Sequence, residues 1–351
     1  MKPDRRLIRS VLSLPTAPFH EEAVAAFVKS FAKKLRLRWR QDRYGNLKIV
    51  YKKGKGNSPF ALTAHMDHPG FEVVRGGRRP IVRLLGGVPD QYFGKARVMV
   101  WNDGVVAKGK AAKRLDKKKR RFVLRLKQPV RRGAFGTFAL PAVRFRGSNI
   151  YTKAADDVIN VALLLNFLQG LVRGRNKAHV IFLFTRAEEV GFVGALGVAK
   201  RKWIRKEIPI IVLEASSAKA GKVKIGGGPV LRVGDKASTF SHAVDLWLQA
   251  AAQDIPHQRA LLPGGRCEAT VFTQKEYRAG CLALPLGNYH NTGPKNYAPE
   301  FVSLKDYRNM LGWLMALTQT ASPQKIRKGK LKELDRIFQK LNRRLKRNSK
   351  G

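Results

Sequence analysis

The sequence predicts an α/β fold: a mixed sheet flanked by helices, with a small all-β domain inserted. Apolar runs typical of buried strands alternate with apolar helical segments on both sides of the insertion. The intervening stretch instead holds short β-rich runs between Gly and Lys/Arg turns, without a helical period. We therefore divide the chain into the first part of the α/β domain, the inserted β-domain, the second part of the α/β domain and a basic amphipathic helix: residues 1–72, 73–148, 149–322 and 323–351.

Composition supports a globular protein. The chain has 351 residues, enough to bury a large core, and 44% of them are apolar. Its two cysteines, Cys267 and Cys281, form no zinc-ribbon pattern and favour a reducing compartment. The first residues are charged and lack a signal-peptide core, and no apolar run is long enough to cross a membrane. These observations predict a cytoplasmic protein.

The net charge is the unusual feature of the composition. Seventy Lys and Arg residues stand against 24 acidic residues, which gives a net charge of +46. The basic residues are spread over most of the chain rather than gathered in one patch. Such a surface should bind RNA or DNA without sequence preference, whatever else the protein does. Charge does not decide the fold.

Before and within the insertion, the pattern predicts mostly short elements. Apolar spacing predicts two helices, a hairpin and a strand in the first part: residues 3–14, 21–35, 42–51 and 60–64. In the inserted domain, the β-rich runs are residues 81–85, 97–101, 122–126 and 142–145. The basic run 117–121 is read as an exposed hairpin tip.

After the insertion, strands and helices alternate. The predicted helices are residues 158–171, one ending near 202, 240–251 and 302–318. The predicted strands are residues 178–184, 208–213 and 280–286. The glycine-rich stretch 221–228 lacks the strand and helix that a dinucleotide-binding loop needs.

The C-terminal tail combines strong basic charge with one apolar stripe. The stripe consists of Leu331, Leu334, Ile337, Phe338, Leu341 and Leu345 at helical spacing. We expect it to pack on the core or on a partner, and we predict no membrane binding.

Acids and histidines recur where the predicted strands of the α/β domain end. The five groups are His65 with Asp67, Asp156 with Asp157, Glu188 with Glu189, Glu214, and His290. In open α/β sheets, ligands bind at the carboxyl ends of the strands. A single acidic pair could be a solvated turn, but the repetition favours a site.

The chemistry of this set suits metal ions. Two imidazoles with several carboxylates fit zinc, cobalt or manganese, and so rich a set can hold two ions bridged by one carboxylate. Two ions clamp a carbonyl oxygen and activate water. His65 and Asp67 lie two apart in an extended chain and point to the same side, so Asp67 can accept the imidazole N–H.

At this point the sequence resembles the dinuclear metallo-aminopeptidases of the tetrahedral, glutamyl-aminopeptidase type. This family belongs to the zinc-peptidase-like clan, which also holds carboxypeptidase- and deacylase-like hydrolases. The matching stretches, in the family's order, are DRYGNL, ALTAHMDHPGFEV, KAADDVINVALLL, TRAEEVGFVGA, VLEAS and GNYHN. RLLGGVPDQY and RRGAFGTF resemble its inserted β-domain, and GGPVLRVGD resembles a stretch after the third metal-binding acid.

The resemblance implies a role for each matching residue. His65 and Glu214 would bind one ion, Glu189 and His290 would bind the other, and Asp156 would bridge them. Glu188 would be the general base, and Asp67 would complete the catalytic set by orienting His65. Asp157 would shape the bridge through the geometry of the peptide bond before it. The cofactors would be two divalent ions, zinc or cobalt.

The chain also departs from the family pattern. His68 stands where the family usually has an acid, Glu214 where this branch often has Asp, and GGRCEA replaces a Gly-Gly-Thr-Asp-like turn. NYHNTG is closer to other branches of the clan. These changes bear more on the substrate pocket than on the metal-binding residues.

The leading hypothesis is a peptide-cleaving aminopeptidase that forms a homo-oligomer through the β-domain, although like-charge repulsion would oppose assembly. The alternatives are a carboxypeptidase or N-acyl-amino-acid deacylase of the same clan, or a polyanion-binding protein on an inactive hydrolase scaffold.

Overall fold

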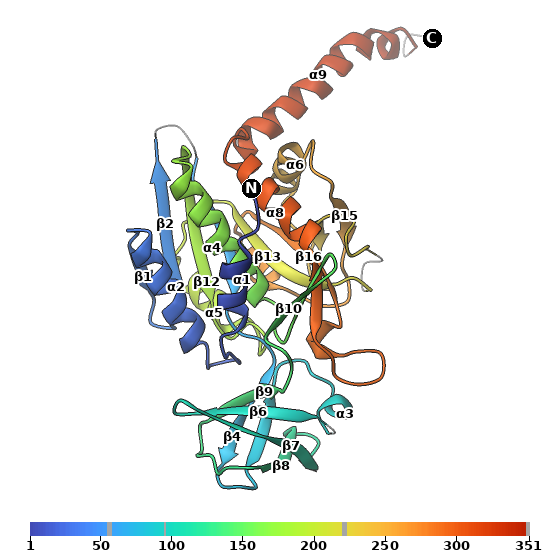
Figure 1. Ribbon diagram of the computed structural model, residues 1–351. Helices are drawn as coiled ribbons and strands as arrows, with labels where there is room; N and C mark the ends of the chain where they lie inside the picture. Colours follow the sequence, from blue (N-terminus) through green and yellow to red (C-terminus); the bar gives the residue numbers. More distant parts are fainter. Residues whose placement is uncertain (55–57, 95, 220–222, 349–351) are drawn as a thin grey trace.

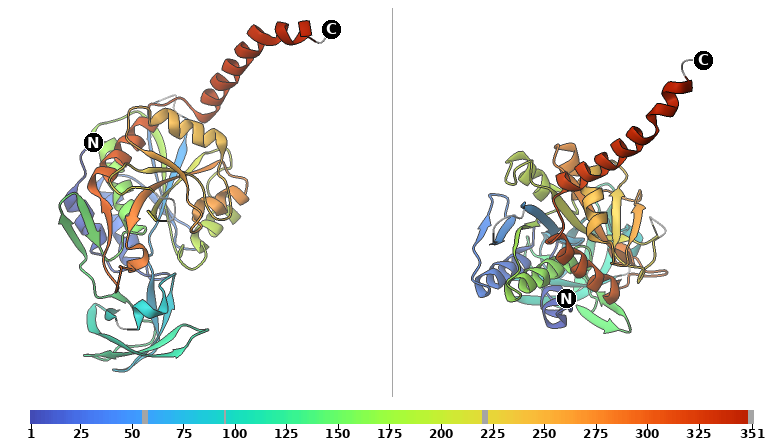
Figure 2. Two further views of the ribbon diagram at one scale, coloured as in Figure 1. Left: turned by 90° about the vertical axis from the view of Figure 1, so that its right-hand side faces the viewer. Right: turned by 90° about the horizontal axis from the view of Figure 1, so that it is seen from above.

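The computed structural model describes residues 1–54, 58–94, 96–219 and 223–348. It confirms the predicted fold class. A large mixed sheet is flanked by helices, and a separate small β-barrel lies at one end of the molecule (Figure 1). The barrel and the C-terminal helix lie at opposite ends of the body (Figure 2).

The chain begins with two helices and a hairpin. Helix α1 (Arg5–Leu12) starts at Asp4, whose carboxylate accepts the backbone N–H groups of Arg6 and Leu7. Helix α2 (Glu22–Lys34) follows, and then β1 (Trp39–Gln41) pairs antiparallel with β2 (Leu47–Lys53). The predicted hairpin is therefore present, with its turn between these strands.

Four parallel strands form the centre of the sheet. They are β12 (Ala178–Thr185), β3 (Phe60–His65), β13 (Ile210–Ser217) and β16 (Ala279–Gly287), in that spatial order. All four are almost wholly buried, which fits their continuous apolar sequences. Antiparallel strands complete the sheet on the side of β16: β17 (Glu300–Ser303), β11 (Asn149–Thr152) and β10 (Val143–Arg146). The parallel centre places four strand ends at one edge.

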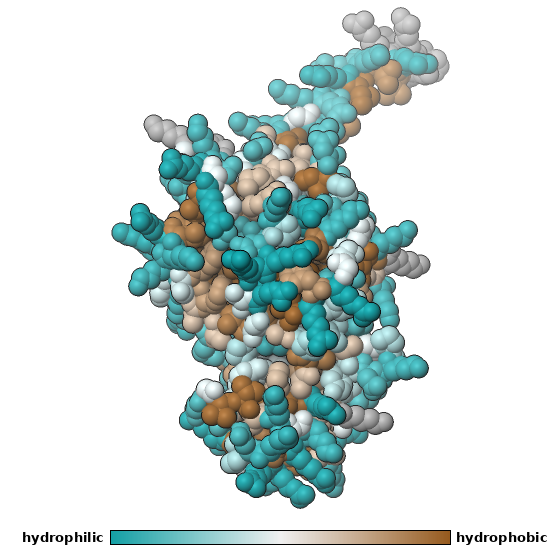
Figure 3. Space-filling model, viewed as in Figure 1, coloured by the Kyte–Doolittle hydropathy of each residue, from teal (hydrophilic) through white to brown (hydrophobic). Residues whose placement is uncertain are grey.

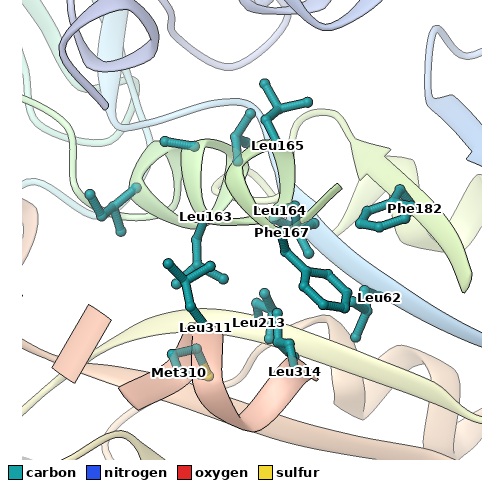
Figure 4. Packing of buried hydrophobic residues seen from close by; sticks show 14 of the residues in the cluster. Leu62, Leu163, Leu164, Leu165, Phe167, Phe182, Leu213, Met310, Leu311 and Leu314 are labelled. Atoms are coloured by element: carbon teal, nitrogen blue, oxygen red, sulfur yellow. The ribbon is translucent and has the colours of Figure 1, made fainter. Parts of the chain in front are cut away.

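Helices cover both faces of this sheet. One face carries α1, α2, α4 (Val158–Arg173), α6 (His242–Ala251) and α8 (Leu304–Leu317), and the other carries α5 (Val193–Lys200) and α7 (Glu268–Gln274). Helix α4 is buried along nearly its whole length. Its leucines and Phe167 meet Leu62, Phe182 and Leu213 of the strands and residues of α8 (Figure 4). This packing fixes the N-terminus of α4 against the sheet.

The small domain is a closed barrel. Its strands are β4 (Gly70–Arg75), β5 (Ile81–Leu85), β6 (Arg97–Asn102), β7 (Val105–Asp116), β8 (Arg121–Leu126) and β9 (Phe135–Phe138), with a short helix α3 (Asp90–Phe93). Closure removes exposed strand edges. The basic run 117–121 forms the β7–β8 turn and the start of β8, as expected of a hairpin tip.

Some elements differ from the sequence-based expectations. The run 142–145, grouped with the inserted domain, forms β10, which pairs with β11 in the large sheet because Val143 and Phe145 pack against the main core. Several strands were not predicted, among them β14 (Val230–Gly234) and β15 (Gln258–Leu261), which extend the sheet beside β16. The glycine-rich stretch 221–228 lies partly outside the described residues. The domain boundaries stay a prediction.

The last helix, α9 (Pro323–Asn348), extends away from the body (Figures 1 and 2). Ile326 packs against the main core and α9 contacts α6, but the stripe predicted to pack is exposed. The expectation of packing on this chain's own core is therefore wrong. Among the residues that the structure describes, no helix is both long and apolar enough to cross a bilayer.

Candidate metal centre

All eight residues that the sequence singled out, Asp157 included, lie together at the carboxyl edge of the parallel strands. His65 ends β3, and Asp67 follows it. Glu188 and Glu189 follow β12, and Asp156 precedes α4. His290 lies in a short 3₁₀ turn, η1 (Tyr289–Asn291), after β16. Glu214 lies inside β13 rather than at its end, since that strand continues to Ser217.

One half of the centre surrounds His65. Its Nε2 atom lies 3.3 Å from Asp156 Oδ1, 3.9 Å from Glu214 Oε1 and 4.0 Å from Glu188 Oε2. Ligand atoms of His65, Asp156, Asp157 and Glu214 all lie within 4.8 Å of one another, and all four side chains are buried. A single cation could contact several of them.

The other half surrounds His290. Its Nε2 atom lies 3.3 Å from Glu189 Oε2 and 3.5 Å from Asp156 Oδ2. The two carboxylate oxygens of Asp156 therefore face different histidines, Oδ1 toward His65 and Oδ2 toward His290. This is the geometry required of a carboxylate that bridges two ions.

The residues fit divalent metal ions. Several of their buried polar atoms have no hydrogen-bond partner among the described residues: both ring nitrogens of His65, His290 Nε2, Asp156 Oδ1 and Glu189 Oε1. Buried polar atoms normally have a partner, because leaving one unsatisfied costs about 1–3 kcal/mol. A cation at these atoms would supply the missing interactions, and imidazole with carboxylate is a donor set typical of zinc and similar ions.

The electrostatics point to the same need for positive charge. Burial raises the pKa of Glu188 well above its ordinary value, and the neighbouring carboxylates of Glu214 and Glu189 raise it further. Burial also raises the pKa of Glu214, helped by the charge of Asp156. For Asp156 itself, burial would raise the pKa, but the imidazoles of His290 and His65 close to its two oxygens outweigh burial and lower the pKa. Several acids crowd one buried space, and cations would relieve their repulsion.

Asp67 holds the backbone of the acidic turn as well as lying beside His65. Its Oδ1 atom is 3.4 Å from His65 Nδ1. The same carboxylate accepts the backbone N–H groups of Glu188 at 3.0 Å and Glu189 at 3.1 Å. Its two bonds to adjacent N–H groups orient the turn, while its contact with the imidazole places His65.

Asp157 fixes the backbone of a segment that carries one of the candidate metal-binding histidines. Its Oδ2 atom accepts the backbone N–H of His65 at 3.3 Å, and its other oxygen accepts the side-chain amide of Asn160. The peptide bond between Asp156 and Asp157 is cis.

Two buried glutamates beside the centre were not predicted from the sequence. Glu300 accepts backbone N–H groups from Ala155 at 2.7 Å, Asp156 at 3.1 Å and His290 at 2.7 Å. It therefore ties together the two segments that carry Asp156 and His290. Glu21, at the start of α2, accepts the backbone N–H of Ala187 at 2.9 Å and pairs with the Arg186 guanidinium at 2.6 Å. Both glutamates bind backbone N–H groups, and such bonds cannot be recognised from the spacing of side chains in the sequence.

His68, which stands where the family usually has an acid, is buried beside these segments. Its ring contacts the carbonyl oxygen of Asp156 and lies 3.1 Å from Asn291 Oδ1. Burial lowers the pKa of His68. The side chain packs behind the centre and contacts the segments that carry its residues.

A cavity of about 170 Å³ opens beside Glu214. Its walls include Ser216, Arg232, Arg266 and Tyr289. The Arg232 guanidinium is buried and donates to Ser216 Oγ at 3.1 Å and to the Gly265 carbonyl at 3.0 Å. Tyr289 stacks on His290 with ring centroids 3.8 Å apart. The cavity thus adjoins Glu214 in one half of the centre and, through Tyr289, lies near His290 in the other, and two arginines are among the residues that line it.

The fold is similar to several solved aminopeptidases. The TET1 peptidase of Pyrococcus horikoshii shares 22% identity over 89% of this chain and 98% of its own, with a TM-score of 0.75. A TET aminopeptidase from a marine sediment thaumarchaeon shares 19% over 92% and 98%, with a TM-score of 0.79. An aminopeptidase of Desulfurococcus kamchatkensis shares 22% over 92% and 96%, with a TM-score of 0.77. Among curated proteins, no sequence matches the chain significantly.

The sequence itself matches a family model. The model of the M42 glutamyl aminopeptidase family aligns with residues 125–311, more than half of the chain. This range includes Asp156, Glu188, Glu189, Glu214 and His290. The match does not favour the carboxypeptidase, deacylase or inactive-scaffold alternatives. The chain belongs to the M42 glutamyl aminopeptidase family and is a metal-dependent aminopeptidase.

Proposed function

We propose that the chain removes N-terminal residues from peptides with a two-metal centre. His65 and Glu214 would hold one ion, Glu189 and His290 would hold the other, and Asp156 would contribute to both. The observation that supports this most strongly is the orientation of Asp156, whose two oxygens lie 3.3 Å and 3.5 Å from the Nε2 atoms of different histidines. We propose zinc or cobalt because imidazole and carboxylate donors suit both.

The ions, when bound, would polarise the scissile carbonyl and lower the pKa of a water molecule. Glu188 is the general base: it accepts a proton from the attacking water and later donates it to the leaving amine. Asp67 serves the reaction by orienting His65 and the turn that carries Glu188.

The cavity beside Glu214 is the proposed site for the side chain of the substrate's first residue. Arg232 and Arg266 give it positive charge, while Ser216 and Tyr289 add hydroxyl groups. A cationic cavity should favour acidic or polar side chains over lysine or arginine.

A substrate panel tests the reaction. Protein dialysed against chelator and reloaded with zinc or cobalt should release the chromophore from L-aminoacyl anilides and leave N-acyl-amino acids intact. Glutamyl and aspartyl anilides should be cleaved faster than lysyl anilide, and Arg266→Gln should reduce that preference. Cleavage of acyl-amino acids alone would move the chain to the deacylase alternative.

We also propose that the surface binds nucleic acids without sequence preference, because the net charge is +46. Affinity for single-stranded RNA should fall steeply with salt, since each neutralised phosphate releases counterions. Binding that survives high salt, or that favours one sequence strongly, would show a specific site instead.

Assembly into a homo-oligomer through the β-domain is a further proposal. Two similar structures are described as a dodecamer and as a tetrahedron or octahedral shell. Light scattering at low and high salt tests it: the mass should exceed one chain and rise with salt, because salt screens the repulsion between basic copies. A cytoplasmic location stays a prediction.

A further inference from the structure

In helix α9, five side chains of the apolar stripe are largely exposed. Leu331, Leu334, Ile337, Phe338 and Leu341 are between 45% and 64% exposed. Ile326, in the first turn of the helix, packs against the main core, and residues 327–341 are exposed. The stripe is visible on the extended helix as brown surface between hydrophilic residues (Figure 3). Exposed apolar side chains in such a continuous row mark an interaction surface.

The stripe lies on one face of the helix. Its members are three or four residues apart, or adjacent at the same face, which matches the helical period. With 26 residues, α9 is about 39 Å long. It projects from the body on the side away from the barrel (Figures 1 and 2), so its length is accessible to a large partner.

The charge of α9 restricts what that partner is. The helix contains eleven Lys and Arg residues and two acids. Lys332, Arg336 and Lys340 follow the same helical spacing on the opposite side of the helix, so α9 has a cationic face behind its apolar stripe. The partner must therefore offer an apolar layer together with negative charge. Nucleic acid offers charge without an apolar layer. A second copy offers the stripe, but it would bring eleven more cationic residues against these.

We propose that α9 binds the surface of an anionic lipid bilayer. The stripe enters the boundary between headgroups and acyl chains, and the long side chains of the polar face's lysines and arginines contact the lipid phosphates. An amphipathic helix of this composition, with low overall hydrophobicity, lies in the plane of the interface and does not cross the membrane. The basic body strengthens the preference for an extended anionic surface, because such a surface meets the helix and the body at once. This inference replaces the expectation of no membrane binding.

The experiment distinguishes membrane binding through the apolar stripe from binding through the positive charge alone. Full-length protein is sedimented with vesicles of phosphatidylcholine alone or with 30% phosphatidylglycerol, at about 0.1 M and about 0.5 M salt, where screening differs. The test variant is Leu334→Gln/Ile337→Gln/Phe338→Gln, which keeps every charge. The matched control is Val105→Gln/Val106→Gln/Leu115→Gln, which removes three exposed apolar residues from β7 of the barrel.

The wild type and the control should bind the anionic vesicles, and part of this binding should persist at the higher salt. The stripe variant should bind at least about tenfold more weakly, because it loses the apolar burial of three side chains. Phe338→Trp should show a blue-shifted emission with anionic vesicles. Aminoacyl-anilide cleavage by the stripe variant should be unchanged, which shows that the enzyme is folded.

Three results would overturn the proposal. Equal vesicle binding by the stripe variant and the wild type would mean that charge alone drives adsorption. A lower mass of the stripe variant in lipid-free solution would assign the stripe to a second copy. Absence of binding to either vesicle would leave a protein partner with an acidic apolar groove as the occupant.

Discussion

The metal centre and the exterior of this protein use charge in opposite ways. Ten of the 24 acidic residues are buried, most of them in or beside the centre, whereas Lys153 and Arg232 are the only buried Lys or Arg among the side chains that the structure describes. The exterior is therefore even more basic than the net charge of +46 indicates. Acids are placed where cations are to be bound, and basic residues where they stay solvated. In this protein, acidic residues are therefore buried far more often than basic residues.

The largest expected effect comes from breaking the shared carboxylate. Asp156→Asn keeps the size of the side chain but weakens its hold on both ions. Because metal ions contribute several kcal/mol to such reactions, and each 1.4 kcal/mol is tenfold, kcat/KM should fall on the order of 10³-fold. Metal analysis after dialysis should show less of both ions. Loss of one ion alone would show that Asp156 does not bridge.

A smaller effect is expected from Glu300, which joins the segments that carry Asp156 and His290. Glu300→Gln keeps shape but replaces a charge-assisted acceptor of three backbone N–H groups. Supporting groups of this kind typically change metal affinity about 10–100-fold. Competition with a fluorescent chelator measures the dissociation constants directly, apart from activity.

Asp306 provides the matched control for Glu300. It is also a buried acid, and it accepts the backbone N–H groups of Gly226 at 2.7 Å and Gly228 at 2.8 Å. It is not among the groups that surround the centre. Asp306→Asn should lower stability and leave metal affinity as in the wild type. If both variants lose metal affinity equally, Glu300 has only a general structural role.

Lys153 is a buried basic residue, and it tests the contrast between the buried acids and the solvated basic residues. Its ammonium donates to the Leu14 carbonyl at 2.8 Å and lies over the Trp101 ring, and burial lowers its pKa to about 8. The unfolded chain, with a lysine pKa near 10.4, then binds more protons between about pH 8 and 10. Stability should therefore rise with pH in this window, by about 1–3 kcal/mol. In Lys153→Met, chemical denaturation should show a smaller rise; an unchanged rise would assign it to other groups.

The smallest effect is expected at the exterior. Lys117→Gln/Lys118→Gln/Lys119→Gln at the β7–β8 tip should change stability by less than about 0.5 kcal/mol per residue and leave anilide cleavage intact. The salt dependence of RNA binding should become less steep, by about 0.7 in logarithmic slope for each phosphate that the tip no longer neutralises. A large drop in cleavage would mean that the tip takes part in the reaction.

The same contrast explains how far the sequence predicts this protein. His65, Asp156, Glu188, Glu189 and His290 were found because each stands where an apolar strand stops or a buried helix starts. That rule depends only on short-range patterns. Glu214 was found as well, although β13 continues beyond it. These residues are far apart in the sequence, and the parallel strands bring them together by placing their ends at one edge of the sheet.

Other features of the structure cannot be predicted from short-range sequence patterns. Glu300 and Glu21 bind backbone N–H groups, and these depend on how distant segments meet in space. The pairing of β10 with the large sheet depends on the packing of Val143 and Phe145, not on their local β-propensity. The α9 stripe has the pattern of a packed helix, and only the fold shows that it extends beyond the core.

The central claim is that adjacent acids of one turn divide the work, Glu189 holding an ion and Glu188 moving the proton. The most direct test compares Glu188→Gln with Glu189→Gln by metal analysis and steady-state kinetics. We predict that Glu188→Gln keeps two ions per chain and a similar KM while kcat falls ~10²–10⁴-fold, as expected when a general base is removed. Glu189→Gln should instead lose one ion and recover activity when metal is added. If Glu188→Gln loses an ion while Glu189→Gln keeps both, the two roles are reversed and the claim is contradicted.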